Sequence, residues 1–289
     1  MSLSLLPLWA LFFLQPPSLA PPDARLDQAL AALAAAAARF LDSAPRFGAH
    51  ETLKQKAIVT PRQPSAPDGG NAPAAARSKD RQLLSAYALC GTLRSQALHE
   101  VRVLYDIDGK TILAPEKAWG ELKDAALVNV SRREELGAEF ERESLGDTAV
   151  DFGQLLLLFQ KANLSKYHFA VKETEMIGAD QALAISFEQQ SGVASLHLNE
   201  AGKKSRSPLE GEIWVRSADY LPLRIVLRAD RDMKKVRIRD EARVDYELHQ
   251  GALLPASVSH RRYLNDQLRA ENVYQYSEWR TLETIPNLK

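Results

Sequence analysis

Apolar and polar side chains alternate along the carboxy-terminal third of the chain. Leu221, Leu223, Ile225 and Leu227 occupy every second position, and residues 236–248 repeat this pattern after a charged turn. A period of two places one face of a sheet against an apolar interior and the other face in water. Residues 211–280 are therefore predicted to form at least four antiparallel strands in succession.

The same alternation predicts strands earlier in the chain. Residues 51–59, 82–93 and 95–107 read as strands, and Asp108–Gly109 is typical of a tight hairpin turn. Alternation resumes at residues 167–198. The total is about ten or eleven strands.

Between these strands the apolar period becomes helical. Residues 23–41 are rich in Ala and Leu and lack Gly and Pro, which favours a helix. Further helices are expected at residues 115–126, at 131–144 with Ser131 as N-cap, and at 152–163. The last contains Leu155–Phe159, apolar on nearly every side, so it should be buried all round. The predicted fold is α+β, mainly β: a strongly curved antiparallel sheet or half-open β-barrel with helices in or over its concave face.

Composition shifts indicate how the chain is organised. An apolar run of about a dozen residues precedes Ser18 and Ala20, which is typical of a signal peptide over residues 1–20 and too short for a membrane-spanning helix. Cleavage near Ala20 would make the protein periplasmic or secreted. An amino-terminal helix is expected within residues 21–48. A single domain is expected over 49–289, with a helical insert at about 115–163 and a flexible Pro- and Gly-containing loop at about 61–78.

Motifs for catalysis, metals and nucleotides are missing from the sequence. The 37 basic residues balance 37 acidic ones, so net charge does not favour nucleic acid. The only cysteine, Cys90, excludes an internal disulfide, and the six histidines lack metal-ligand spacing. Neither a glycine-rich phosphate loop nor a G-x-S-x-G elbow occurs. We therefore expect no catalytic residues, no metal, no cofactor and no enzyme activity.

Aromatic residues are concentrated in the carboxy-terminal sheet. They are explained either by ordinary core filling or by a cavity beneath the sheet that takes a lipid chain. The candidates for lining such a cavity come from this sheet and from the apolar helix: Phe152, Leu156, Phe159, Trp214, Tyr274 and Tyr276.

Several short phrases of this sheet resemble a known family. They are Gly-Glu-Ile-Trp-Val-Arg at 211–216, Tyr-Leu-Pro-Leu-Arg at 220–224, Leu-Pro at 254–255 and Tyr-Gln-Tyr at 274–276. Together they resemble the bacterial lipoprotein-localisation superfamily, which includes the LolA, LolB and RseB proteins. Residues 108–110 and 151–159 are similar to uncharacterised exported proteins of this type. The resemblance covers about residues 49–283 as a pattern. It implies a half-open barrel with helices as a lid over an apolar cavity, and it transfers no functional residue.

The favoured function is non-enzymatic binding of a lipid or a lipoprotein acyl chain in the cell envelope. An alternative is an envelope sensor or interaction module that docks a partner protein through the same sheet, which predicts an exposed apolar patch rather than a cavity. An exported hydrolase is a third possibility. Nucleic acid is not an expected partner, peripheral membrane association is compatible with either of the first two functions, and the oligomeric state stays open.

Overall fold

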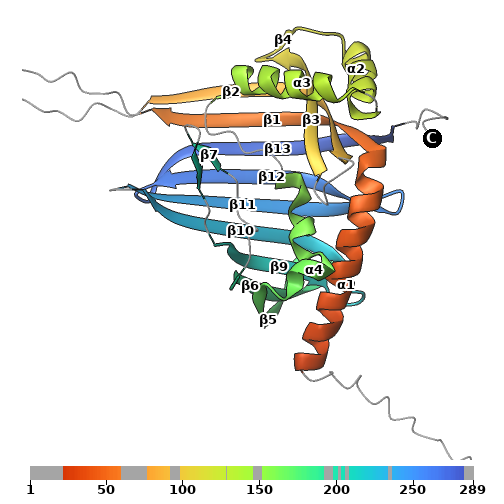
Figure 1. The fold of residues 1–289 in the computed structure, drawn as a ribbon, viewed down its shortest axis with the longest axis vertical. Coiled ribbons are helices and arrows are strands. Elements are labelled where there is room, and N and C mark those ends of the chain that lie inside the picture. Colours follow the sequence, from red (N-terminus) through yellow and green to blue (C-terminus); the bar gives the residue numbers. More distant parts are fainter. Residues whose placement is uncertain are drawn as a thin grey trace, which may run out of the picture.

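The computed structural model describes residues 22–59, 77–91, 98–127, 129–145, 152–191, 198–200, 203–205, 208–233 and 236–282 (Figure 1). The predicted signal peptide lies outside these residues. So does the predicted loop, except that its last two residues belong to a strand.

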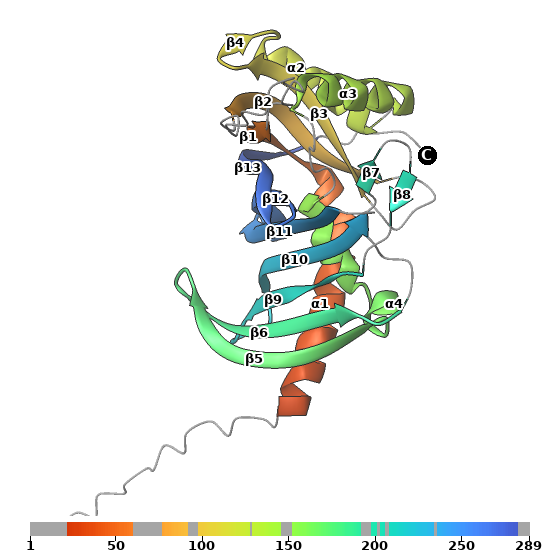
Figure 2. The ribbon, with the colours of Figure 1, turned by 90° about the vertical axis from the view of Figure 1, so that its left-hand side faces the viewer.

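Most of the described chain forms one large antiparallel sheet. From edge to edge its strands are β4 (Lys110–Thr111), β3 (Leu98–Ile107), β2 (Arg77–Gly91), β1 (Phe47–Val59), β13 (Gln267–Thr281), β12 (Ala252–Leu264), β11 (Val236–His249), β10 (Pro222–Met233), β9 (Glu210–Arg216), β6 (Asp180–Gln189) and β5 (Tyr167–Ile177). Within the described residues these 11 strands make a strongly curved sheet that does not close into a barrel (Figure 2). β7 (Leu198–Glu200) and β8 (Lys203–Ser205) pair separately. The predicted fold class is confirmed.

Helical segments cover the concave face, here called the inner face, along one diagonal. α1 (Pro22–Ser43) crosses the strands and continues through the short η1 (Ala44–Arg46) into β1 (Figures 1 and 2). Its buried positions include Leu33, Ala36 and Phe40, one turn or so apart. The predicted helix at 152–163 is two elements instead: η2 (Phe152–Phe159), a 3-10 helix, and α4 (Lys161–Leu164).

α2 (Pro115–Leu127) and α3 (Val130–Glu143) pack at the β2–β3 end of the sheet. α2 lies on the convex, outer face, where Ala86 and Ala88 of β2 meet Leu122 in a separate apolar cluster. The N-cap of α3 is Asn129, whose side chain accepts a hydrogen bond from the backbone N–H of Arg132 at 3.0 Å. The prediction of Ser131 as N-cap was wrong by two residues, because an Asn side chain already satisfies this free N–H.

Candidate ligand-binding face

A continuous row of apolar residues crosses the inner face from one side of the sheet to the other. Each strand from β5 to β3 contributes one residue, and every neighbouring pair is in direct cross-strand register. In sheet order the members are Val171, Ile185, Ile213, Ile225, Val244, Val258, Tyr274, Leu53, Leu83 and Ile107. We call this set the apolar row. The row forms a continuous apolar strip that runs at right angles to the strands.

α1 and η2 cover the apolar row. Phe40 of α1 contacts the ring of Tyr246 edge-on at 6.2 Å between centroids, and Leu156 and Phe159 of η2 are fully buried in the same core cluster. η2 is eight residues long and contains a backbone kink at Gln154. The kink divides η2 into two short 3-10 pieces, because the poorer hydrogen bonds of a 3-10 helix rarely sustain longer runs. The inner face is therefore closed partly by an irregular segment.

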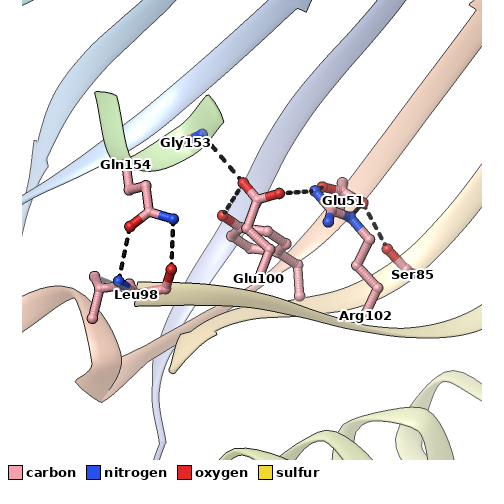
Figure 3. A network of polar contacts seen from close by, with 8 residues as sticks. Glu51, Ser85, Leu98, Glu100, Arg102, Gly153 and Gln154 are labelled. Atoms are coloured by element: carbon pink, nitrogen blue, oxygen red, sulfur yellow. Dashed lines mark hydrogen bonds and ion pairs between the residues drawn. The ribbon is translucent and has the colours of Figure 1, made fainter. Parts of the chain in front are cut away.

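Beside the apolar row, Arg102 forms a buried ion-pair network (Figure 3). Its guanidinium donates two hydrogen bonds to Glu51, at 2.8 and 2.9 Å, and one to Glu100 at 2.9 Å. The Ser85 hydroxyl donates to Glu51 at 2.9 Å. Glu51 is 1% exposed and Arg102 is 5% exposed, so water screens these charges little.

Aromatic rings surround the Arg102 guanidinium. It lies 5.1 Å from the ring centre of Tyr87, 4.8 Å from that of Phe140 on α3, and 5.4 Å from that of Tyr274. Burial alone lowers the pKa of Arg102, but the charges of Glu100 and Glu51 outweigh it and hold that pKa well above its usual value. For Tyr87, in contrast, burial raises the pKa, so the phenol stays neutral. Arg102 is thus a fixed cation on the inner face, paired with two carboxylates.

The same network fastens η2 to the sheet. Glu100 accepts hydrogen bonds from the Tyr87 hydroxyl at 3.1 Å and from the backbone N–H of Gly153 at 3.2 Å. The Gln154 amide pairs with the backbone of Leu98, accepting at 2.8 Å and donating at 2.5 Å (Figure 3). A few directional contacts therefore hold the amino-terminal end of η2 in one register.

Farther along η2, the hydroxyl of Tyr246 provides a second attachment. It accepts from the backbone N–H of Leu156 at 3.0 Å and donates to the carbonyl of Gly153 at 3.4 Å. A 3-10 helix leaves backbone N–H and C=O groups at its ends without partners inside the helix. Side chains that hydrogen-bond to these groups therefore stabilise it.

A second buried polar group, centred on Asp240, lies on the other side of the apolar row. Asp240 accepts hydrogen bonds from His260 at 2.9 Å, from Arg262 at 2.8 Å and from Arg231 at 2.9 Å. Burial raises the pKa of Asp240, but the bonds and charges of His260 and Arg262 lower it overall, to about 2. The ring of Phe152, the first residue of η2, stacks on His260 with 5.2 Å between centroids. Polar groups therefore flank the row on both sides at this end of the sheet.

The structure brings together five of the predicted lining residues. Phe152, Leu156, Phe159, Tyr274 and Tyr276 all belong to the inner core cluster. Trp214 does not join them: it packs on the outer face with Ala182 and Ala184, and its indole N–H donates to Glu175. Its neighbours Ile213 and Val215 point inward instead, so period-two alternation itself excludes Trp214 from the inner face.

Sequence reasoning missed an aromatic cluster at the β5–β6 edge. Phe159 of η2 lies 5.1 Å from Phe187, 6.3 Å from Tyr167 and 6.2 Å from Phe169, measured between ring centroids. The alternation of Tyr167, Phe169 and Val171 was visible in the sequence, but nothing in it indicated that η2 would end at this strand.

Comparison with known proteins gives likenesses of fold. No family model and no curated protein sequence matches the chain. A putative outer membrane lipoprotein-sorting protein domain from Vibrio parahaemolyticus is 9% identical, with a TM-score of 0.41 over 91% of this chain and 94% of that one. A DUF1329 family protein from Desulfovibrio piger is 11% identical, with a TM-score of 0.39 over 93% and 95%. These likenesses concern the fold alone.

Within the described ranges, no three His, Cys, Asp or Glu side chains gather in a way that could hold a metal ion. None of the helices in that part of the chain is long and apolar enough to cross a membrane.

Proposed function

We propose that the protein binds an acyl chain, as a free lipid or attached to a lipoprotein, on the inner face of its sheet. The observation that carries this proposal is the apolar row, closed over by α1 and by the irregular η2. An extended alkyl chain lying along the row would contact one side chain from each strand it crosses. Each methylene buried there is worth about 0.8 kcal/mol.

η2 serves as the movable part of the cover. Four of its apolar side chains, Leu155, Leu156, Leu157 and Phe159, fill the inner face in the closed state. An acyl chain that takes their place fills the same volume, so the apolar residues of the inner face stay buried away from water. The polar contacts at Gly153 and Gln154 set the free energy needed to lift the segment.

The remaining parts of the proposal follow from the sequence. Residues 1–20 act as a signal peptide, the protein works in the periplasm or cell envelope, and it acts without catalysis, cofactor or metal. A lipid or an acylated protein is its partner. The lipoprotein-sorting likeness agrees with this assignment but adds no independent weight.

Mass spectrometry of organic extracts from the native protein tests the proposal directly. A co-purifying acylated molecule, together with saturable uptake of a fluorescent fatty acid, is the expected result. A lipid-free protein that takes up no fluorescent fatty acid contradicts it.

A variant of η2 tests the movable cover. Gln154→Ala removes two hydrogen bonds to Leu98, each worth about 1 kcal/mol net, so the open state should become about thirtyfold more populated and uptake correspondingly faster. Gln275→Ala, on the exposed outer side of β13, is the matched control and should change nothing. Equal uptake rates for the two variants would show that η2 does not move.

A further inference from the structure

The two ends of the apolar row have different surroundings. Toward β1–β3 and β11–β13 the row runs between the Glu51–Arg102 pair and the Asp240–His260 group, all of them buried. Toward β5–β10 both flanks are apolar. On one side lie Phe169, Phe187 and Leu227, and on the other lie Leu183 and Val215.

An alkyl chain is favoured only in the half with apolar flanks. Methylenes placed beside a buried charge would displace the polar groups that hydrogen-bond to it, and they offer that charge no hydrogen bond in return. From Val171 to Ile225 the row crosses three strand spacings, roughly 14 Å at about 4.8 Å each. This distance accommodates most of a fatty acyl chain.

Tyr167 supplies an unused polar group at the edge of this half. Its side chain is on β5 and the residue is 7% exposed. Its hydroxyl is buried and has no hydrogen-bond partner among the residues that the structure describes. Burial raises the pKa of Tyr167 to about 12, so the phenol is a neutral donor. An unpaired buried hydroxyl costs about 1–3 kcal/mol, which an added acceptor would recover.

The surroundings of Tyr167 limit what that acceptor can be. The rings of Phe169 and Phe187 lie 6.0 and 5.9 Å from the Tyr167 ring, and Phe159 closes the cluster. Phe169 and Val171 are only half-buried, so the apolar interior reaches the surface here. Because these rings carry no charge, a neutral carbonyl suits the site better than a carboxylate, whose buried charge would need a cation.

We propose that the acyl chain lies along the β5–β10 half of the apolar row and that the Tyr167 hydroxyl donates a hydrogen bond to its ester or amide carbonyl. This rests on the proposed function and deepens it by naming the chemical class of the ligand's polar end. An ester carbonyl corresponds to a glycerolipid, and an amide carbonyl to an N-acylated protein terminus.

Three probes with the same chain separate the possibilities: methyl palmitate, N-methyl palmitamide and hexadecane, each displacing a fluorescent fatty acid. In Tyr167→Phe, affinity for the ester or the amide is expected to fall about fivefold, the equivalent of one hydrogen bond, while hexadecane binds as before. Tyr105→Phe, in the outer cluster, is the matched control and should leave all three affinities unchanged.

The outcomes keep the two proposals apart. If the wild type binds none of the three probes, the proposed function fails and this inference fails with it. If the wild type binds all of them and Tyr167→Phe is indistinguishable from it, only the inference is overturned. The carbonyl probe that loses more affinity in Tyr167→Phe shows whether an ester or an amide is the better match to the site.

A photoreactive palmitate ester gives a second test that needs no variant. With its diazirine next to the carbonyl, it is expected to label peptides from β5 or β6 (Tyr167–Ile177, Asp180–Gln189). Labelling confined to β12 and β13 would overturn the assignment.

Discussion

Replacing Arg102 by Met should be among the most damaging single changes in the protein. Exposed ion pairs contribute about 0–1 kcal/mol, whereas breaking a buried pair costs about 3–5 kcal/mol. The side chains of Arg102, Glu51 and Glu100 are 4%, 0% and 3% exposed, which places this network in the second class. Met fills much of the same volume but leaves two carboxylates without their cation. We expect the free energy of unfolding to fall by about 4 kcal/mol.

A double variant separates the lost charge from lost packing. Arg102→Met combined with Glu51→Gln removes one of the stranded carboxylates, so it should recover about 2 kcal/mol relative to Arg102→Met alone. Urea unfolding followed by tryptophan fluorescence gives all three free energies. A double variant no more stable than Arg102→Met would refute this reasoning, because the loss would then come from the rings packed around the guanidinium.

Further expectations concern pH and glycine. Asp240 has a lowered pKa in the folded protein, so its contribution of about 2 kcal/mol is present above pH 4 and is lost as pH falls towards 2. The stability gap between wild type and Asp240→Asn, measured by urea unfolding, should therefore shrink over that range; a constant gap would contradict it. At Gly211 an added Cβ would lie 2.0 Å from the backbone oxygen of Val226, so Gly211→Ala should cost more than 3 kcal/mol. Gly137 lies in α3, and an added Cβ there would have no neighbour within 4 Å. Gly137→Ala should therefore stabilise the protein by about 0.5–1 kcal/mol, and thermal melts of the two glycine variants provide the comparison.

The sheet could be predicted from the sequence because alternation is a local property. It specified the strands and the apolar side of the sheet, while the unbroken apolar run at 155–159 predicted the burial of most of η2. It also held the information needed to place Trp214, whose flanking Ile213 and Val215 face inward. The residue type alone points the other way, because a large aromatic side chain suits a cavity wall.

The buried charges could not be predicted in the same way. Glu51 and Arg102 are 51 positions apart, and the pattern of neither strand indicates that the two side chains pair. Only the strand order, with β1 and β3 on either side of β2, brings them together. The form of η2 was equally hidden, because its apolar composition fits an α-helix and a 3-10 helix alike.

Buried charges on an otherwise apolar inner face give the covering segment a unique position. Apolar contacts alone are non-directional, so η2 could slide along the row with little change in buried area. Hydrogen bonds from the backbone N–H of Gly153 to Glu100 and from that of Leu156 to the Tyr246 hydroxyl fix it at one register, since a shift of one residue breaks both. These bonds are few and lie near the amino-terminal half of η2. Phe159, at the far end, is held by ring contacts with Phe187 and Tyr167. Under the proposed function, a ligand arriving at the β5–β6 edge meets the end of η2 that ring contacts hold, and opening should begin there.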